Sequence, residues 1–275
     1  MRNELRRFRA NRLTVIGTML TVAIVAMALL ANRIAPYDPT ALNARHRLEA
    51  PSVDFRFGTD RLGRDVLSRV VYGARSSLSI AASSVVASLL LGSVLGLLAG
   101  YFGGGVDLVI GRSMDILFSF PALLLAIAIA AMLGPGLRNA ALAIAVVYTP
   151  LFARVIRGPV IAERHRDYVQ AAHVIGASHV AIVVRHILPN VVSPVIIQAS
   201  AALSAAILIE AALSYVGLGT QPPEPSWGTM LSEGRTFLET APWMSIFPGV
   251  AIAATVLAFN LLGDGLRDVF DPTLS

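Results

Sequence analysis

Long runs of apolar residues without any charged side chain recur along the chain. A transmembrane helix needs about 20 consecutive, mostly apolar residues. Runs close to or above this length lie at residues 13–32, 76–106, 116–137, 139–153, 186–209 and 240–263. The pattern therefore predicts an all-α membrane protein with six transmembrane helices.

The ends of several runs carry recognisable signals. Residues 13–32 are too long for a signal peptide and lack a small-residue cleavage site, so we expect an N-terminal anchor helix. The second span is expected to end near Gly100, and the third ends at the turn Gly134-Pro135-Gly136. Arg154 shortens the fourth run, but an arginine at a helix end can reach the headgroups, so this span extends to about Ile156.

The composition agrees with a membrane protein. Of the 275 residues, 55% are hydrophobic and 14% are charged, whereas soluble domains carry about 25% charged residues. The mean hydropathy is +0.69. The absence of cysteine excludes disulfides, thiol catalysis and thiolate metal sites. The net charge of +5 does not indicate nucleic-acid binding, because the arginines cluster beside apolar runs, as membrane topology requires.

The distribution of arginine predicts the orientation, since cytoplasmic loops are enriched in Arg and Lys. The N-terminal tail and the loop after the fourth span are both rich in arginine. These arginines are Arg2, Arg6, Arg7, Arg9 and Arg12 in the tail and Arg154, Arg157, Arg164, Arg166 and Arg185 in the loop. The loop 33–75 also carries arginines, but it carries acidic residues as well, and we interpret it as a small folded element. With six spans, both the N and C termini are expected in the cytoplasm.

These expectations divide the chain into segments. Cytoplasmic tails cover residues 1–12 and 265–275, and the anchor helix covers 13–32. Residues 33–75 form a periplasmic loop, 76–264 form the membrane core, and 157–189 form a cytoplasmic loop within that core.

The end of the periplasmic loop has an amphipathic pattern. Val66, Leu67, Val70 and Val71 share one face of a helix over 61–75. We expect this helix to lie on the outer membrane surface, or alternatively to pack on another subunit.

Three glycines in the second span, Gly92, Gly96 and Gly100, recur every four residues. This spacing of small residues lets two helix backbones approach closely. It predicts tight packing of the second span on another helix, either within this chain or in a neighbouring subunit.

The sequence contains no recognisable catalytic motif. G-x-S-x-G, H-E-x-x-H and G-x-G-x-x-G are absent, and a phosphate-binding loop needs a lysine, whereas all 22 basic residues here are arginine. The histidines, at positions 46, 165, 173, 179 and 186, match no standard spacing of metal ligands. We therefore expect neither an enzyme nor a metal or cofactor site.

The polar segment 168–190 has a helical pattern of its own. A helix is expected over 168–175, where Ala171 and Ala172 leave one face nearly flat, and Gly176 suits its left-handed C-terminal cap. Ser178 can cap a second helix. A short helix with a small-residue face is shaped to dock in a groove of another protein, although an ordinary interfacial helix has the same pattern.

The second helix of this segment leads into the fifth span. Val180, Val183 and Ile187 recur at helical spacing and predict a buried face. Pro189 permits a kink where the span enters the membrane.

Two further features lie near the outer end of the fifth span. Glu210 is the one ionisable residue in the apolar run 205–216, so its carboxyl group must face protein or water rather than lipid. It either bonds to a neighbouring helix or lines a pathway. The loop 217–227 holds Gln221, Trp227 and three prolines that stiffen it. We expect this loop to face the entrance and to present Trp227 as a contact surface, unless it is only a rigid connector.

The segment 168–190 resembles the signature loop of the membrane subunits of bacterial ABC importers, written E-A-A, three residues, G, nine residues, I-x-L-P. Here Gln170-Ala171-Ala172 precedes Gly176, and Leu188-Pro189 follows at the matching spacing. Gln170 replaces the glutamate of the signature, so a role that depends on the negative charge cannot be assigned to this position. His186 occupies the isoleucine position.

Other motifs, spread over nearly the whole chain, are similar to the C-type permease of the dipeptide/oligopeptide/nickel permease family. They are FGTDRLGRDVLSRVVYGARSSL (57–78), DILFSFPALLLAIAI (115–129), ARVIRGPV (153–160), IEAALSYVGLGTQPPEPSWGTML (209–231) and FNLLGDGLRDVFDP (259–272). Among them, the Gly-Thr-Asp-x-x-Gly-Arg-Asp and Gln-Pro-Pro-x-Pro-Ser-Trp-Gly runs are specific.

The resemblance implies an ABC importer type-1 permease fold in the lipid bilayer of the bacterial cytoplasmic membrane. It also implies a second permease subunit, two ATPase subunits that hydrolyse ATP, and an extracytoplasmic substrate-binding protein. By resemblance, the coupling loop that docks on an ATPase includes Tyr168, Gln170, Ala171, Ala172, Gly176, Ala177, His186, Leu188 and Pro189. The candidates for the pathway or gate are Glu210, Gln221 and Trp227.

The resemblance makes di- and oligopeptides the expected substrates, with nickel, glutathione or another small solute as alternatives. A secondary transporter or channel is disfavoured, because the chain shows no clear internal repeat and has only Glu210 as an ionisable residue inside a span. A membrane enzyme is disfavoured because no catalytic constellation is present.

Overall fold

The computed structural model describes residues 12–270, and within them it contains helices but no β-strand. The helices are α2 (Arg12–Leu29), α3 (Ala31–Ile34), α4 (Val66–Phe102), α5 (Gly104–Phe118), α6 (Ala122–Leu133), α7 (Leu137–Glu163), α8 (Asp167–Val174), α9 (His179–Ile182), α10 (Leu188–Tyr215), α11 (Trp227–Gly234) and α12 (Trp243–Phe270). Turns of 3-10 helix cover Ala44–His46 and Arg235–Phe237, and a π-helical turn covers Val183–Ile187. The predicted all-α class is confirmed.

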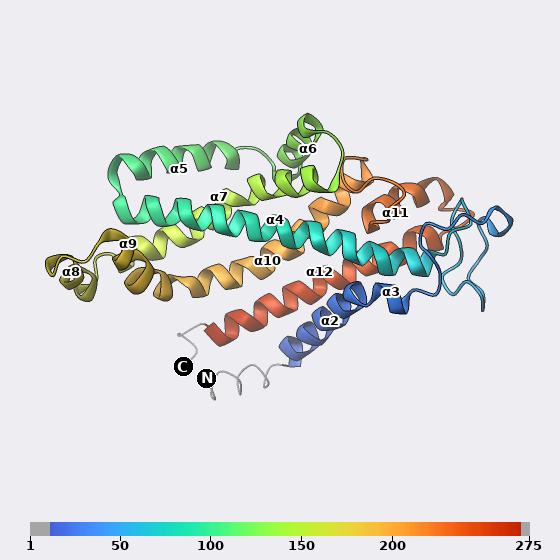
Figure 1. Cartoon of the computed structure of the whole chain (residues 1–275), viewed down its shortest axis with the longest axis horizontal. Coiled ribbons are helices and arrows are strands. Elements are labelled where there is room, and N and C mark those ends of the chain that lie inside the picture. Colours follow the sequence, from blue (N-terminus) through green and yellow to red (C-terminus); the bar gives the residue numbers. More distant parts are fainter. Residues whose placement is uncertain (1–11, 271–275) are drawn as a thin grey trace.

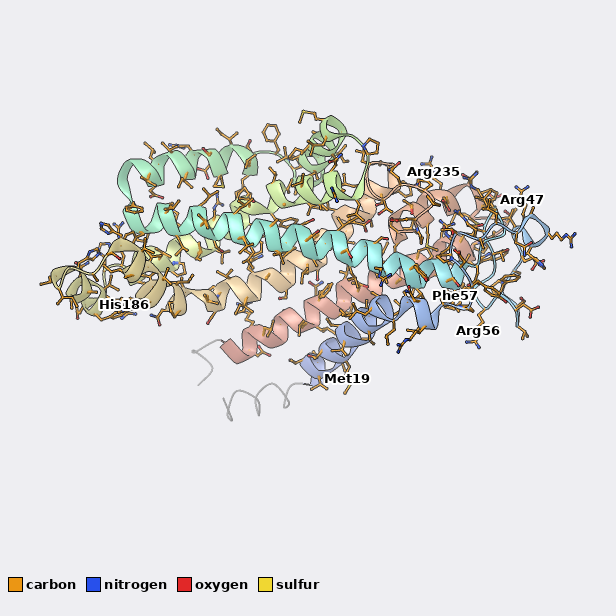
Figure 2. All side chains as sticks on the ribbon, viewed as in Figure 1. Met19, Arg47, Arg56, Phe57, His186 and Arg235 are labelled. Carbon is orange, nitrogen blue, oxygen red and sulfur yellow. The ribbon has the colours of Figure 1, made fainter. Side chains whose placement is uncertain are left out.

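The long helices run roughly along the longest axis of the molecule (Figure 1). The loop between α3 and α4 lies at one end together with α11, and α8 and α9 lie at the opposite end. Figure 2 shows Arg47 and Arg56 at the first end and His186 at the second. Residues 265–270 of the predicted C-terminal tail are the last turns of α12, whereas residues 1–11 and 271–275 lie outside the described part of the chain.

Four described helices are long and apolar enough to cross a membrane, namely Val66–Phe102, Leu137–Glu163, His179–Tyr215 and Trp243–Asp268. The bent pair α5–α6 supplies a fifth if it is taken as one span. The predicted first span corresponds to a shorter apolar helix, Leu13–Leu29. Each apolar run of the sequence is therefore mainly helical, but the helices differ in length from the predicted spans.

The third predicted span is not one straight helix. Its first three residues end α5, which begins at Gly104, and most of the remainder forms α6. The axes of α5 and α6 differ by 93°. The break lies at Ser119-Phe120-Pro121. Proline has no N–H to donate and disfavours helical geometry in the residue before it, so Pro121 ends α5 and begins a new helix.

The predicted amphipathic helix at 61–75 does not lie on the membrane surface, and this expectation is wrong. Asp65 caps α4 by accepting a hydrogen bond from the Ser68 amide (2.7 Å), and the helix then continues for 37 residues. Val66 and Val70 are buried against Met230 and Met244. The apolar face that the sequence indicates is therefore covered by α11 and α12 of the same chain.

The glycines of α4 mark its contact with α7, which is the most extensive helix pair of the described chain. A β-carbon added at Gly92 would lie 2.5 Å from the carbonyl oxygen of Thr149 and 2.7 Å from the β-carbon of Phe152. One added at Gly96 would overlap Ile156 and the carbonyl oxygen of Ala153. The repeat of small residues thus serves packing within the chain, which is the first of the two alternatives the sequence left open.

A buried cluster of charges joins the loop before α4 to α11. Arg64 Nε donates to Asp60 (2.6 Å), and Arg69 also donates to Asp60. Glu233 on α11 accepts from Arg64 (2.9 Å) and from Arg69 (2.7 Å). Burial alone would raise the pKa of the Asp60 carboxyl, but Arg69 and Arg64 outweigh this effect and hold that pKa below its usual value. The four charges balance, which allows them to be buried together.

The contact between α4 and α7 predicts opposite effects for two glycines. Gly92→Ala should destabilise the protein by about 1–3 kcal/mol, because the overpacked backbones must separate. The control is Gly111→Ala on α5, where an added β-carbon meets nothing within 4 Å. This control should be neutral or stabilising by up to about 1 kcal/mol, since alanine favours helix. Thermal unfolding of the purified protein in detergent measures both, and shifts of the same sign would contradict the assignment.

The buried charge cluster predicts a large effect for Arg69→Met. Removing this guanidinium leaves two carboxylates with one partner in a buried site, which should cost about 3–5 kcal/mol. The matched control is Arg61→Met, because Arg61 lies in the loop directly before α4 and is exposed. The difference between the two melting temperatures tests the prediction, and equal values would show that the cluster does not stabilise the fold.

Candidate functional site

The segment between α7 and α10, residues 164–187, consists of two short helices joined at a glycine. Gly176 has φ +82°, its N–H donates to the His173 carbonyl (3.0 Å), and the Ala177 N–H donates to the Ala172 carbonyl (3.0 Å). These two bonds form a Schellman cap at the end of α8. Ser178 caps α9 by accepting from the Ala181 amide (3.3 Å). The predicted left-handed Gly176 and the predicted Ser178 cap are both confirmed.

The two alanines of the signature do not form one face. Ala172 is buried together with Val169, whereas Ala171 and Gln170 are exposed. Successive residues of an α-helix point about 100° apart, so neighbours cannot share a narrow face. The expectation of a flat Ala171–Ala172 surface is wrong, because Ala172 is small where α8 packs on its own chain.

Apolar side chains surround the turn at Gly176. Val174 is 87% exposed, Ile175 is 82% exposed and Val180 is 74% exposed. We call these three residues the apolar tip. The prediction that Val180 belongs to a buried face is wrong, because Ile182 and Ile187 occupy that face instead. Exposed apolar clusters on soluble surfaces mark contacts with other proteins.

The segment is fastened to the end of α4. The Tyr101 hydroxyl lies 2.8 Å from Nδ1 of His179 and 3.3 Å from Nε2 of His173. Arg164 donates to the carbonyl oxygens of Gly100 and Tyr101, each at 3.1 Å. These contacts connect both short helices, and the residue before them, to the last turn of a long helix.

A second set of contacts fastens the segment to α7 and α10. Tyr168 donates to Glu163, whose carboxylate raises the pKa of the Tyr168 hydroxyl. Asn190 on α10 donates to the Tyr168 hydroxyl (3.1 Å) and to the His186 carbonyl (2.7 Å). Gln170 donates to the Arg164 carbonyl (3.0 Å). Gln170 therefore stabilises the segment through a neutral hydrogen bond.

The chain passes from this segment into α10 through the π-helical turn Val183–Ile187, and Leu188 and Pro189 form the first turn of α10. Proline cannot donate a backbone hydrogen bond, and its ring crowds the preceding turn. The wider π-turn accommodates Pro189, so that His179–Tyr215 continues as one long helical stretch. The distortion predicted at Pro189 is thus located in the turn before it.

At the opposite end of α10, Glu210 is fully buried within the chain. Its Oε1 accepts from the Ser214 hydroxyl (2.7 Å), its Oε2 makes no hydrogen bond with the described residues, and the hydroxyls of Ser77 on α4 and Ser226 before α11 lie nearby. Glu210 is thus surrounded by polar groups from three elements. This geometry supports the structural alternative for Glu210, in which the carboxyl group connects helices.

Trp227, at the start of α11, is also fully buried. Its indole N–H donates to the Val70 carbonyl (2.9 Å) and its amide donates to the Ser77 hydroxyl (3.3 Å). The expectation that Trp227 presents an exposed contact surface is wrong, because it packs α11 on α4. Gln221 is exposed, but its side chain donates to the carbonyls of Gly217 and Gly219 (3.0 Å each) and so stabilises its own turn.

Known proteins agree with this architecture. The family described as binding-protein-dependent transport system inner membrane component matches residues 92–275. The N-terminal transmembrane domain of oligopeptide transport permease C matches residues 2–51. The chain belongs to the binding-protein-dependent permease family. Together with its long apolar helices, this makes it a multi-pass inner membrane transport component rather than an enzyme.

Individual relatives of the permease match along nearly its whole length. It is 47% identical to the di/tripeptide transport system permease protein DppC of Pseudomonas aeruginosa, over 97% of this chain and 90% of that one. It is 43% identical to the dipeptide transport system permease protein DppC of Alkalihalophilus pseudofirmus, over 99% and 90% of the two chains. It is 43% identical to the glutathione transport system permease protein GsiD of Pectobacterium atrosepticum, over 98% of this chain and 90% of that one.

The fold of the permease also resembles a solved structure. A chain of the methionine ABC transporter MetNI, in an inward-facing conformation, matches with a TM-score of 0.60 and 20% identity. The match covers 73% of this permease and 96% of that chain. The similarity confirms the predicted type-1 permease fold of an ABC importer.

Two groups of residues in the permease escaped the sequence interpretation. The first is Tyr101 with His173 and His179, which are far apart along the chain. The second is the charge cluster of Asp60, Arg64, Arg69 and Glu233, although its first three members lie in or next to the Gly-Thr-Asp-x-x-Gly-Arg-Asp run. A dense run of opposite charges beside an apolar span was the available signal for a buried cluster.

The surroundings of Glu210 predict different results for two substitutions. Glu210→Gln keeps an acceptor for the Ser214 hydroxyl, so folding and transport should remain near normal. Glu210→Leu removes that acceptor, and a buried hydroxyl without a partner costs about 1–3 kcal/mol, so the yield of folded protein and its melting temperature should fall. Size-exclusion chromatography, thermal unfolding and uptake measure these effects. Normal folding of Glu210→Gln with loss of uptake would instead indicate that the charge acts in the pathway.

Proposed function

We propose that this permease is one of two membrane subunits of an ATP-driven importer that carries di- and oligopeptides across the bacterial cytoplasmic membrane. The observation that carries the proposal is the apolar tip, which is exposed at the end of a segment fastened to α4, α7 and α10. A partner bound at this tip can move three long helices together. In this arrangement ATP hydrolysis belongs to two ATPase subunits, in agreement with the absence of lysine for a phosphate-binding loop.

The proposed topology has six crossings, with both termini in the cytoplasm. The crossings are α2, α4, the bent pair α5–α6, α7, α10 and α12. In support, the start of α2 and the end of α12 both point toward the end of the molecule that carries α8 and α9 (Figure 1). Arg164, Arg166 and Arg185 belong to that same end, as the enrichment of arginine in cytoplasmic loops requires.

The coupling loop is the segment between α7 and α10. We assign docking on the ATPase to the apolar tip, with Gln170 and Ala171 beside it on the exposed side. Gly176 and Ala177 form the turn that presents the tip, while Ala172, His186, Leu188 and Pro189 connect it to the rest of the chain. Closure of the ATPase pair would then move the segment as a rigid body and reorient the attached helices.

The second permease subunit is placed against α5 and α6. None of the residues of α5 is buried within this chain, and the ion pairs Arg157–Asp107 and Arg154–Asp115 hold it to α7. The break at Pro121 separates two apolar helices. Irregular backbone at membrane depth is tolerated only where protein or a water-filled cavity covers it. We therefore propose that this break faces the other subunit and the translocation pathway between the two.

The opposite end of the molecule is the proposed docking face for the extracytoplasmic binding protein. Arg47, Arg56 and Arg235 lie there (Figure 2). An acidic surface on the binding protein would complement them. Gln221 belongs to the same face and is the one remaining pathway candidate that is exposed.

The relatives named for dipeptide and di/tripeptide transport support peptides as the substrate class, and the relative named for glutathione supports a small peptide-like solute as the second candidate. Competition between substrates for uptake distinguishes these two candidate substrate classes. Unlabelled dipeptides should suppress uptake of a labelled dipeptide, whereas glutathione or a nickel chelate should not. Suppression by glutathione alone would reverse the assignment.

The apolar tip predicts that Ile175→Asp uncouples the importer. A charge in a desolvated interface is strongly unfavourable, so the ATPase subunits should dissociate or their activity should lose its response to substrate. The spans should assemble normally, because Ile175 makes no buried contact. The control is Val53→Asp, at a position that is 95% exposed at the other end of the molecule, and it is compared in co-purification with the ATPase subunits, which it should leave unchanged. Co-purification and ATP-dependent uptake give the readout. Full uptake with Ile175→Asp would refute docking at the tip.

A further inference from the structure

Two cavities of the permease meet at Arg75, where the uncharged part of α4 begins. The first, of about 620 Å³, lies between residues 32–40, α4 and the loop before α11. The second, of about 350 Å³, lies between α2, α4, α10 and α12. Arg75 lines both cavities. A polar cavity and an apolar cavity therefore border the same residue.

The first cavity contains charges that do not satisfy one another. Asp38, Glu224 and Arg75 line it, yet among the described residues Arg75 and Glu224 form no ion pair. The Asp38 carboxylate accepts from the Thr40 hydroxyl (2.6 Å) and amide (2.7 Å), which lower the pKa of Asp38 and keep it ionised at neutral pH. The cavity thus offers one cation and two anions to a ligand.

The second cavity is lined mainly by apolar side chains, which include Val25, Leu29, Leu78, Leu203 and Phe259. Along α4 it extends from Arg75 to Ala82, seven residues further, which corresponds to about 10 Å of helix. This length accommodates the upper part of an acyl chain. In the proposed topology, on which this inference rests, Arg75 lies at the outer limit of the hydrocarbon core, where long cationic side chains reach the headgroups.

We propose that the two cavities form one binding site for a zwitterionic glycerophospholipid of the outer leaflet, of the phosphatidylethanolamine type. Arg75 binds the phosphate, because a guanidinium group matches phosphate oxygens with two parallel hydrogen bonds. Asp38 and Glu224 bind the ammonium group, and Tyr37 and Tyr72 border the headgroup. One acyl chain fills the apolar cavity between α2 and the remaining helices.

The charges favour this occupant over the alternatives. A phosphatidylglycerol headgroup carries the phosphate but no ammonium group, so it would leave both carboxylates without a cationic partner. A protein segment could occupy both cavities only if it had an apolar stretch for the second cavity and, next to it, both an anionic and a cationic group for the first. The bound lipid would fill the space between α2 and α4 and so hold the N-terminal helix against the core.

Native mass spectrometry of the intact importer complex tests the site. The complex is released from vesicles that contain equal amounts of phosphatidylethanolamine and phosphatidylglycerol. We expect wild type to retain phosphatidylethanolamine preferentially. Arg75→Gln should reduce retained lipid by about tenfold, since it removes a charge-assisted hydrogen bond. The matched control, Arg56→Gln, alters an arginine at the same end that lines neither cavity and should retain the wild-type amount.

Two further variants test each half of the site. The double variant Asp38→Asn, Glu224→Gln should keep lipid but lose the preference for phosphatidylethanolamine. Ala82→Trp should block the apolar cavity and expel the acyl chain. Arg75 and Glu224 are exposed, so their variants leave the fold intact and remain informative even if Ala82→Trp prevents assembly.

The proposal is wrong if Arg75→Gln retains as much lipid as Arg56→Gln, or if wild type retains both lipids equally. It is also wrong if protein covers the apolar cavity. The chain has no cysteine, so Ala82→Cys introduces a unique thiol. Cross-linking of this thiol to another subunit in the membrane would show that the occupant is protein. None of these measurements depends on transport, and a failure here leaves the proposed import function untouched.

Discussion

The close backbone contact between α4 and α7 is the constraint on which the rest of the architecture depends. Gly92, Gly96 and Gly100 allow this contact, because side chains at those positions would overlap α7. Lipid provides no hydrophobic drive for helices to associate, so packing of this kind must supply much of the attraction. Once α4 is packed against α7, the positions of its two ends are determined. The loops and short helices that contact these ends are positioned by them.

Clusters of polar side chains lie at both ends of α4. Through them, α4 connects the two ends of the molecule. At the end that carries α11, Asp60 and Glu233 neutralise two buried arginines and hold the long loop and α11 to the helix. At the opposite end, Tyr101 contacts two histidines of the segment between α7 and α10. A hydrogen bond in a poorly solvated site is strong only when its partners are in place. α4 therefore connects the two ends of the molecule through ion pairs at one end and hydrogen bonds at the other.

The sequence predicted what local physics determines. Apolar runs predicted the positions of the helices, and the glycine and serine signals at Gly176 and Ser178 predicted the turn between α8 and α9. The directions in which side chains point were harder to predict from the sequence, because they depend on which neighbour a helix packs against. Ala172 is buried within the chain, and Trp227 is buried where α11 packs on α4. The apolar face of α4 that includes Val70 packs on α11 rather than facing lipid. These are long-range contacts, and periodicity alone does not identify the partner. Pro121 was visible in the sequence, but it lies inside the uncharged run 116–137, which was interpreted as one span.

The same constraint separates a rigid part of the permease from a loosely held one. α4 packs on α7 through small residues, and α10 contacts both helices and carries the buried Glu210. α5 has no buried residue and is joined to α7 by two ion pairs, one of which, Arg154–Asp115, is largely exposed to solvent. Exposed pairs contribute about 0–1 kcal/mol, far less than interlocked backbones. In the proposed arrangement, a force applied at the apolar tip acts first on these three helices. α5 is the element that is held to them most weakly, whereas α6 is anchored by the buried Ala126 and Ala130.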